Sequence, residues 1–271
     1  MKNSRKNTLM NCELDNSIIE KIVESVVFNS QAHIEMTENS FYIPVGNGTE
    51  VSLIKWLQDA EIPVHEFMQK KEGRVYAQVP FDSQLKRSII AVHHPEMQDI
   101  VRVYIKGAPE IVLRNCTTHY QSTELQRDGT RRAEKRPLSQ EEINQIMGKI
   151  MNEQMTYLAL RPIAFSYCDM DVTTFDRVMN AMQGDVDSAN EIAALERDQT
   201  FLALIGLKDP IRPDIKNVVK DARAATINLR LCSGDNLHTT AKVAYDVDIM
   251  TDQEYRVYSQ GGNQSVAMDA S

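Results

Sequence analysis

The stretch YIKGAPEIVLRNC, residues 104–116, joins a lysine to a glycine bend and a short apolar helix. Lys106 ends an alternating run that is typical of a strand, and Pro109 suits the first turn of the helix that should follow. A helix start presents free N–H groups, and Gly107 would let a ligand approach the backbone. A lysine beside a helix amino end favours an anion such as phosphate. The same residues also fit an ordinary turn with a solvated lysine.

The stretch VPFDSQLKRS combines an aromatic ring with cations. Phe81 should end a strand, and Lys86 and Arg87 follow after a polar loop. This arrangement can stack a nucleic base on the ring while the cations reach its phosphates. The alternative is a core phenylalanine beside a solvated basic loop.

The stretch GNGTE, residues 46–50, places two glycines before a helix that should begin with Thr49 as its N-cap. The spacing and the lysine of a P-loop are absent, which argues against a Walker site. Glu50 would repel a phosphate group here. It could accept a hydrogen bond from an amino group such as that of adenine, or it could simply stabilise the first helical turn.

Two aspartates follow predicted buried strands. Asp209 stands in LKDPIRP and Asp235 in CSGDN. Open parallel sheets bind ligands where their strands end, so both residues are candidates for a ligand site. Either aspartate could instead cap the helix that follows it.

The elements that must position these residues are predicted from hydrophobic periodicity. A helix should run from Asn16 to about Asn29, and Ser139 with Glu142 forms a capping box ahead of a long helix. Three strands, 74–81, 87–94 and 101–107, have the short connections of an antiparallel meander. Another strand is predicted at 161–170.

The chain changes character near residue 199. The expected order is a strand at 200–210, a helix at 212–225, a strand at 227–235 and a helix at 236–247, which is typical of a parallel sheet. The predicted fold class is therefore α/β (α+β): an antiparallel sheet flanked by helices, then a partial doubly wound segment. The predicted parts are a linker (1–15), a first domain (16–198), a partial second domain (199–250) and a flexible tail (251–271).

Composition excludes several classes of protein. The chain of 271 residues has 38 acidic and 30 basic residues and a net charge of −8, which argues against a nucleic-acid partner. Its four cysteines show no C-x-x-C spacing, so neither a zinc site nor a disulfide framework is expected. No apolar run reaches the ~20 residues of a membrane helix. The expectation is a soluble globular chain without direct membrane insertion.

The order of the motifs GNGTE, FDSQLK, KGAPE, LRPIA, DPIRP and SGDN resembles the cytosolic headpiece of a P-type ion-transporting ATPase over nearly the whole chain. Within that superfamily the wording is most similar to the plasma-membrane-type calcium pumps. The similarity lies in YIPVGNGTEVSLIKWL, YIKGAPEIVLRNC and IGLKDPIRPDIKNVVKDARAA.

This resemblance implies a nucleotide-binding domain that holds ATP by its adenine half. On this basis the Phe81 ring stacks on adenine and Glu50 bonds the edge of the base. Lys86 and Lys106 line the pocket, and Gly107 gives close access. The resemblance also implies that Arg161 reaches the phosphates, that Asp209 and Arg212 belong to a hinge, and that a nucleotide-facing loop contains Ser233, Gly234 and Asp235.

The departures from the family pattern decide what chemistry to expect. The phosphorylated aspartate of D-K-T-G-T is missing, and so is the magnesium-holding G-D-G-x-N-D. Ser233 replaces a usual threonine, Ala159 a usual glycine, and Ser83 a frequent arginine. The expected function is to present ATP for phosphorylation of an aspartate that this chain lacks. No catalytic or metal-binding residue is assigned, and magnesium belongs to the complete enzyme.

The resemblance also names partners and a location. The partners would be ATP or ADP and the rest of the pump, namely the actuator, the remaining phosphorylation domain and the membrane helices. The location would be the cytoplasmic side of the plasma membrane or a related compartment. An alternative is a truncated, non-transporting relative that serves as a nucleotide sensor or interaction subunit. A hydrolase of the haloacid-dehalogenase type would need an amino-terminal nucleophile aspartate on a strand, which the sequence lacks.

Overall fold

A computed structural model describes residues 15–37, 41–125, 131–155, 158–183, 194–208, 211–233 and 237–261. The chain divides into two compact units. Unit 1 comprises the described residues up to Ile143 together with Ile163–Ile205, and unit 2 comprises those of Asn144–Pro162 and from Gly206 onward. No helix in the described part of the chain is long and apolar enough to cross a membrane.

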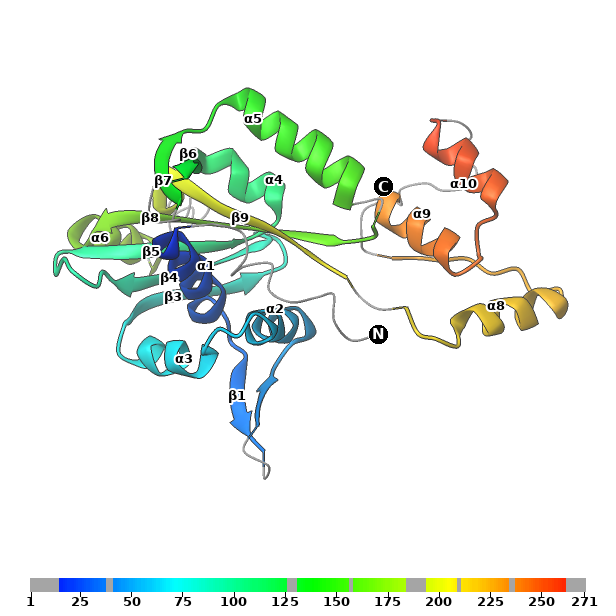
Figure 1. Cartoon of the computed structure of the whole chain (residues 1–271), viewed down its shortest axis with the longest axis horizontal. Helices are drawn as coiled ribbons and strands as arrows, with labels where there is room; N and C mark the ends of the chain where they lie inside the picture. The colour runs from blue at the N-terminus through cyan, green and yellow to red at the C-terminus, as the bar shows by residue number, and fades with distance from the viewer. Residues whose placement is uncertain are drawn as a thin grey trace. The chain divides into compact units, whose positions relative to one another are not determined.

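A seven-stranded sheet organises unit 1, with the order β3-β4-β5-β8-β9-β6-β7 (Figure 1). The pairs β3/β4, β4/β5, β5/β8 and β6/β7 are antiparallel, and β6 is parallel to β9. The predicted antiparallel meander is therefore confirmed. The strands are β3 (Val75–Asp82), β4 (Arg87–His93), β5 (Ile100–Gly107), β6 (Cys116–Leu125), β7 (Arg131–Pro137), β8 (Arg161–Asp171) and β9 (Gln199–Leu207).

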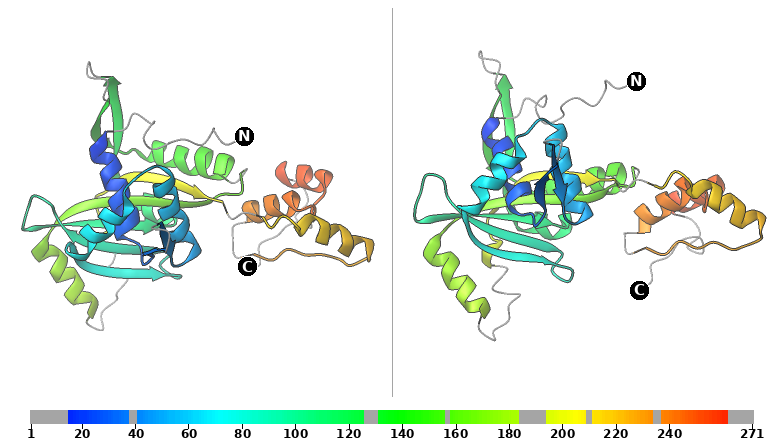
Figure 2. Two further views of the ribbon diagram at one scale, coloured as in Figure 1. Left: turned by 60° about the horizontal axis from the view of Figure 1, so that its bottom comes forward. Right: turned by 90° about the horizontal axis from the view of Figure 1, so that it is seen from below.

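Three helices cover one face of this sheet near β5. The helix α1 (Asn16–Phe28) packs on β5, while α2 (Gly48–Asp59) and α3 (Val64–Glu72) pack against α1 (Figures 1 and 2). β5 is buried along almost its whole length. Its polar residues Arg102, Tyr104 and Lys106 share the face that contacts α1 and α2, because alternate residues of a strand point to the same side.

Each of the helices α1 and α2 begins with an N-cap side chain. Asp15 caps α1 by accepting a hydrogen bond from the N–H of Ser17 at 2.9 Å, and the helix ends one residue before the predicted Asn29. The N-cap of α2 is Asn47, not Thr49: its Oδ1 accepts from the N–H of Glu50 at 3.0 Å. The asparagine side chain forms the same type of cap two residues earlier.

A two-stranded antiparallel ribbon lies between α1 and α2 in sequence. It consists of β1 (His33–Met36) and β2 (Tyr42–Val45), and it extends away from the large sheet (Figure 1). Met36, Phe41, Tyr42 and Ile43 are exposed on it. The sequence analysis did not identify this ribbon.

The helices between β5 and β9 in sequence follow the predictions in part. Pro109 begins the short helix α4 (Pro109–Val112), which continues into a single 3-10 turn, η1 (Leu113–Asn115). The predicted capping box is confirmed, since the N–H of Ser139 donates to Oε2 of Glu142 at 2.8 Å. It opens α5 (Gln140–Gln145), which continues as the π-helix η2 (Ile146–Met155); α6 (Val172–Gln183) follows β8.

Unit 2 contains η2 together with α8 (Ile215–Ala224), α9 (Leu237–Asp246) and α10 (Asp252–Ser259). Ala241, Ala244 and Met250 form its small core. The strand expected at 200–210 is β9 and belongs to the seven-stranded sheet, and the strand expected at 227–235 is not formed over its described residues 227–233. A strand needs a neighbour for its backbone hydrogen bonds. In the described part of unit 2, the only strand segments are the ends of β8 and β9. Residues 252–259, expected in a flexible tail, form a capped helix.

Candidate nucleotide-binding site

Lys106 lies near the end of β5, and only 6% of the residue is exposed. Its Nζ donates to the backbone carbonyl of Asn29 at 2.6 Å and to Oε1 of Glu50 at 2.8 Å. Burial lowers the pKa of Lys106, and the negative charge of Glu50 opposes that change. These two contacts use two of the three N–H groups of the ammonium. Among the described residues, these contacts fix the cation and leave one N–H group for a further acceptor.

Glu50 joins this lysine to two other parts of unit 1. The carboxylate lies in the first turn of α2, and its Oε2 accepts from the N–H groups of Gln31 at 3.0 Å and Ala32 at 3.1 Å. Burial by itself would raise the pKa of Glu50, but the charge of Lys106 and the hydrogen bonds to the carboxylate lower that pKa overall. Glu50 therefore stays ionised, although only 8% of it is exposed.

The structure brings Phe81 to the same end of the sheet as Lys106. Asp82 of β3 pairs with Arg87 of β4, which pairs in turn with Gly107 of β5. Phe81 directly precedes Asp82 in β3, and Lys106 directly precedes Gly107 in β5. Phe81 is 62% exposed, so its ring is open to solvent and is not a core residue.

Lys86 and Gly107 meet in the turn beside this row. The turn closes with a hydrogen bond of 2.7 Å from the N–H of Lys86 to the carbonyl of Asp82, and Lys86 has a left-handed φ of 53°. The side chain of Lys86 is exposed. A Cβ on Gly107 would lie 2.6 Å from both the carbonyl oxygen of Lys86 and the Cβ of Arg87. The missing side chain of Gly107 thus permits the close approach of β4.

Polar groups that the sequence analysis missed surround Lys106. Ser88 pairs with Lys106 across β4 and β5, and the side-chain amide of Asn29 donates to the carbonyl of Ser88 at 3.0 Å. Oγ of Ser88 and Oδ1 of Asn29 are buried and have no hydrogen-bond partner among the described residues. Lys71 of α3 donates to the carbonyl of Ser30 at 2.5 Å. The sequence shows that these residues are polar. It could not predict their contacts, because the contacts join distant segments of the chain.

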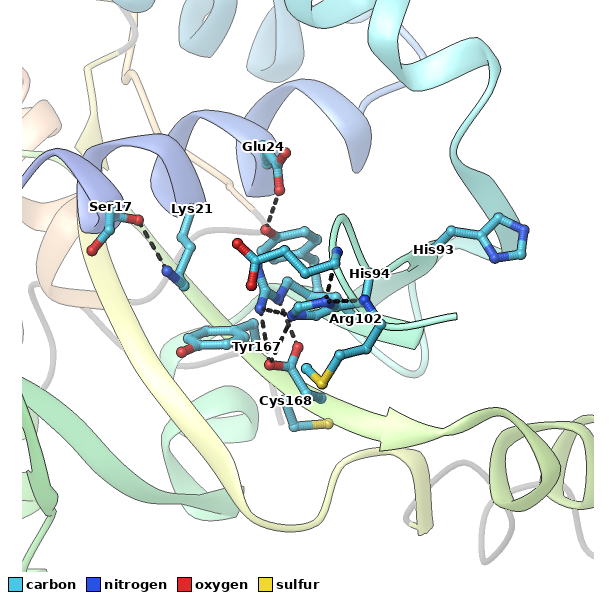
Figure 3. Close-up of polar contacts among 12 residues, drawn as sticks. Ser17, Lys21, Glu24, His93, His94, Arg102, Tyr167 and Cys168 are labelled. Carbon is cyan, nitrogen blue, oxygen red and sulfur yellow. Dashed lines mark hydrogen bonds and ion pairs between the residues drawn. The ribbon is translucent and has the colours of Figure 1, made fainter. Parts of the chain in front are cut away.

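The polar face of β5 also carries Tyr104 and Arg102, and Figure 3 shows the surroundings of Arg102. Arg102 binds both carboxylate oxygens of Asp169, at 2.6 and 2.9 Å, and lies 2.9 Å from Nε2 of His94. Glu24 of α1 accepts a hydrogen bond of 2.6 Å from the hydroxyl of Tyr104. Figure 3 shows Glu24 and Lys21 pointing from α1 toward the sheet. The ion pair with Asp169 neutralises the buried Arg102, and the hydrogen bond between Tyr104 and Glu24 attaches β5 to α1.

The other predicted site residues are either in unit 2 or outside the described residues. Arg161 is exposed at the first residue of β8, Ser233 is exposed, and Arg212 is exposed with its Nε 3.5 Å from Oδ1 of Asp214. Asp209, Gly234 and Asp235 lie outside the described residues. Across the described ranges, no group of three His, Cys, Asp or Glu side chains could hold a metal ion.

The chain is similar to known proteins over most of its length. A family profile for the P-type ATPase, cytoplasmic domain N, matches residues 18–214. The chain is similar to Calcium-transporting ATPase 2 of Cryptococcus neoformans, with 28% identity over 84% of the chain and 15% of that protein. Similarity to Calcium-transporting ATPase 5, plasma membrane-type, of rice (Oryza sativa) is 31% over 88% of the chain and 20% of that protein. The human Plasma membrane calcium-transporting ATPase 4 is 28% identical over 86% of the chain and 17% of its own length. The chain thus spans a fifth or less of these three relatives.

Proposed function

The chain belongs to the family of P-type ATPase cytoplasmic N domains, and we propose that it binds ATP or ADP at the site around Lys106. The observation that carries this proposal is the placement of an exposed aromatic ring on β3 and a fixed, buried cation on β5 at the same end of these strands, which lie on either side of β4. A ring open to solvent can stack a base, and an ammonium with an N–H group to spare can meet an acceptor on the same ligand.

Each residue of unit 1 has a proposed role. The ring of Phe81 stacks on adenine, and Glu50 orients Lys106 and bonds the edge of the base. Lys86, exposed at the turn, reaches toward the phosphates. Gly107 lies beside Lys86 at this end of β5, and its backbone is the proposed point of close access for the ligand. The contact between Lys106 and Glu50 supports the orienting role of Glu50, and the exposure of Phe81 and Lys86 supports their contact with a ligand.

The proposal for the whole protein is a calcium-transporting ATPase in which this chain holds the nucleotide. Its support is the names of the relatives, which are calcium-transporting ATPases. The phosphoryl acceptor motif D-K-T-G-T is not in the sequence, so we assign ATP binding and not ATP hydrolysis to the chain itself. In this proposal the chain lies on the cytoplasmic side of a membrane and works with the rest of the pump, and magnesium accompanies ATP in the complete enzyme.

On family resemblance, we also propose a role in nucleotide binding for a further set of residues. These residues are Arg161, Asp209, Arg212, Ser233, Gly234 and Asp235.

Titration calorimetry with ADP tests the site. We expect high-micromolar binding by the unchanged chain. Phe81→Ala should weaken it about fivefold or more, since stacking on an aromatic ring contributes ~1–3 kcal/mol. Phe41→Ala is the matched control, because Phe41 is also exposed, at 71%, but lies on the β1–β2 ribbon. Equal binding by the unchanged chain and Phe81→Ala would contradict the assignment.

A test of Lys106 requires a variant that keeps the buried charges balanced. Lys106→Ala removes the partner of the buried Glu50, which destabilises a fold strongly. The double variant Lys106→Met with Glu50→Gln removes both charges together. Loss of ADP binding with an unchanged near-ultraviolet circular dichroism spectrum is the expected result, and retained affinity would show that the nucleotide does not depend on this pair.

A further inference from the structure

The segment that follows α1 is held by two lysines and one carboxylate. Lys106 donates to the carbonyl of Asn29, and Lys71 donates to the carbonyl of Ser30 at 2.5 Å. The next two N–H groups, of Gln31 and Ala32, donate to Glu50. Cations at the carboxyl end of a helix are stabilised by its last carbonyl groups and by the helix dipole. The two lysines therefore meet at one end of α1 although they come from α3 and β5.

Glu50 is the carboxylate that these two lysines share. Burial lowers the pKa of Lys71, the charge of Glu50 raises it, and the charge of Lys106 lowers it further. Lys106 is in direct contact with Glu50, whereas Lys71 contacts the backbone of Ser30. One negative and two positive charges leave the group Lys71–Glu50–Lys106 with one positive charge uncompensated.

We propose that Lys71 is a specificity-determining residue of the nucleotide site, where the uncompensated charge favours nucleoside phosphates over uncharged nucleosides. This inference rests on the nucleotide binding proposed above. Glu50 cancels the field of Lys106, its direct partner, and Lys71 restores a positive potential at the same place. Lys71 needs no contact with the ligand for this effect, because Coulomb attraction acts over several ångströms at a partly buried site.

The competing explanation is that Lys71 only ties α3 to the end of α1. Three substitutions separate the effect of the Lys71 charge from the effect of its hydrogen bond to Ser30. Lys71→Arg keeps the charge, Lys71→Gln keeps a hydrogen-bond donor without the charge, and Lys71→Met keeps neither. Lys70→Gln is the matched control, because it removes the same charge one residue earlier on α3, where Nζ lies 5.0 Å from the ring of Phe67 and is exposed.

The test is a calorimetric titration of each variant with ADP and with adenosine. In Lys71→Gln, ADP binding should weaken about fivefold at low salt while adenosine binding changes less than about twofold, and the loss should shrink in high salt. Lys71→Arg should retain the preference for ADP, and Lys70→Gln should match the unchanged chain. Because both ligands are titrated into the same protein preparation, a smaller folded fraction cannot imitate a change in their affinity ratio.

Three results would overturn the role of Lys71. They are an unchanged ADP-to-adenosine ratio in Lys71→Gln and Lys71→Met, an equal change in Lys70→Gln, and a loss of the preference in Lys71→Arg equal to that in Lys71→Gln. If the unchanged chain binds ADP while the ratio is unaffected, only this inference fails. If the unchanged chain binds neither ligand, the proposed nucleotide site fails with it.

Discussion

Glu50 connects three segments of unit 1, because its carboxylate accepts hydrogen bonds from Lys106 and from the N–H groups of Gln31 and Ala32. All these donors favour the ionised form. The pKa of Glu50 is accordingly lower in the folded chain than its ordinary value of 4.5. A carboxylate with a lowered pKa contributes stability above its unfolded pKa and loses that contribution as the pH falls through the folded pKa.

The first prediction of stability follows from this pKa. Glu50→Gln should destabilise unit 1 by about 2–4 kcal/mol at neutral pH, since it leaves Lys106 buried without its charge partner. Below pH 4.5 the unchanged chain should lose stability faster than Glu50→Gln. Urea unfolding between neutral pH and pH 3 measures both effects. Glu35→Gln is the control, because Glu35 is exposed in a pair with His33; parallel pH profiles for the unchanged chain and Glu50→Gln would refute the argument.

Gly107 shows why a residue type alone does not define a role. The sequence predicted that its missing side chain lets a ligand approach. In the structure, the space that a Cβ would need is taken by the carbonyl of Lys86 and by Arg87. Both explanations require a glycine, so only the position of β4 could separate them. Access of a nucleotide to this backbone stays a proposal.

At the scale of elements, short-range patterns predicted much of unit 1. The alternation in β3, β4 and β5 and the capping box of Ser139 and Glu142 are local signals, and the structure confirms the corresponding strands and helix start. The pairing of β9 could not be predicted in the same way. An apolar run shows that a strand is buried, but its sheet depends on which neighbour offers hydrogen bonds, and β9 joins β6.

The candidate site likewise contains some residues that local motifs predicted and others that depend on long-range contacts. Phe81, Lys86 and Lys106 stand in recognisable motifs and were predicted from the sequence. Lys71 and Asn29 were not, because their contacts join residues 41 and 77 positions apart. Motifs reveal residues that act within one turn or strand end, whereas the charge balance of Lys106 depends on how α1, α2 and α3 pack together.

The helix α10 offers a prediction at this scale. Its first turn is closed by a capping box, in which the Thr251 hydroxyl accepts from the N–H of Glu254 and the Glu254 carboxylate accepts from the N–H of Thr251. Thr251→Ala should destabilise α10 by about 1 kcal/mol, because an N–H group of the first turn loses its acceptor. Faster amide hydrogen exchange within residues 252–259 is the expected observation. Ser259→Ala, at the other end of α10, is the control; equal exchange in both variants would mean that the box does not hold the helix.

At the scale of the whole molecule, the two units differ in how they are stabilised. Unit 1 buries both faces of its central strands, and fully buried residues such as Tyr104, Phe165 and Ile90 fill its interior. Unit 2 has a small cluster around Ala241, Ala244 and Met250, to which aromatic rings such as Tyr245 and Tyr255 contribute. A larger buried core stabilises a unit more, so we expect unit 1 to resist denaturants better than unit 2.

Three of the four cysteines lie in the described part of the chain, and they report on the two units separately. Cys116 and Cys168 are buried in unit 1, and burial raises the pKa of each thiol to about 12. Cys232 is exposed in unit 2. Since the thiolate is the reactive form, iodoacetamide near pH 8 should modify Cys232 in the folded chain and leave the other two thiols unmodified. Mass spectrometry of peptides from the labelled chain measures each site.

The dependence of this labelling on urea then tests whether unit 1 unfolds as one body. Cys116 lies at the start of β6 and Cys168 within β8, on either side of β9 in the sheet. If the sheet unfolds cooperatively, both thiols should become reactive with one midpoint, and that midpoint should coincide with the loss of ADP binding. The fully denatured chain supplies the reference rates. Reaction of Cys168 well before Cys116 would show instead that the sheet opens between β8 and β6 while the rest stays folded.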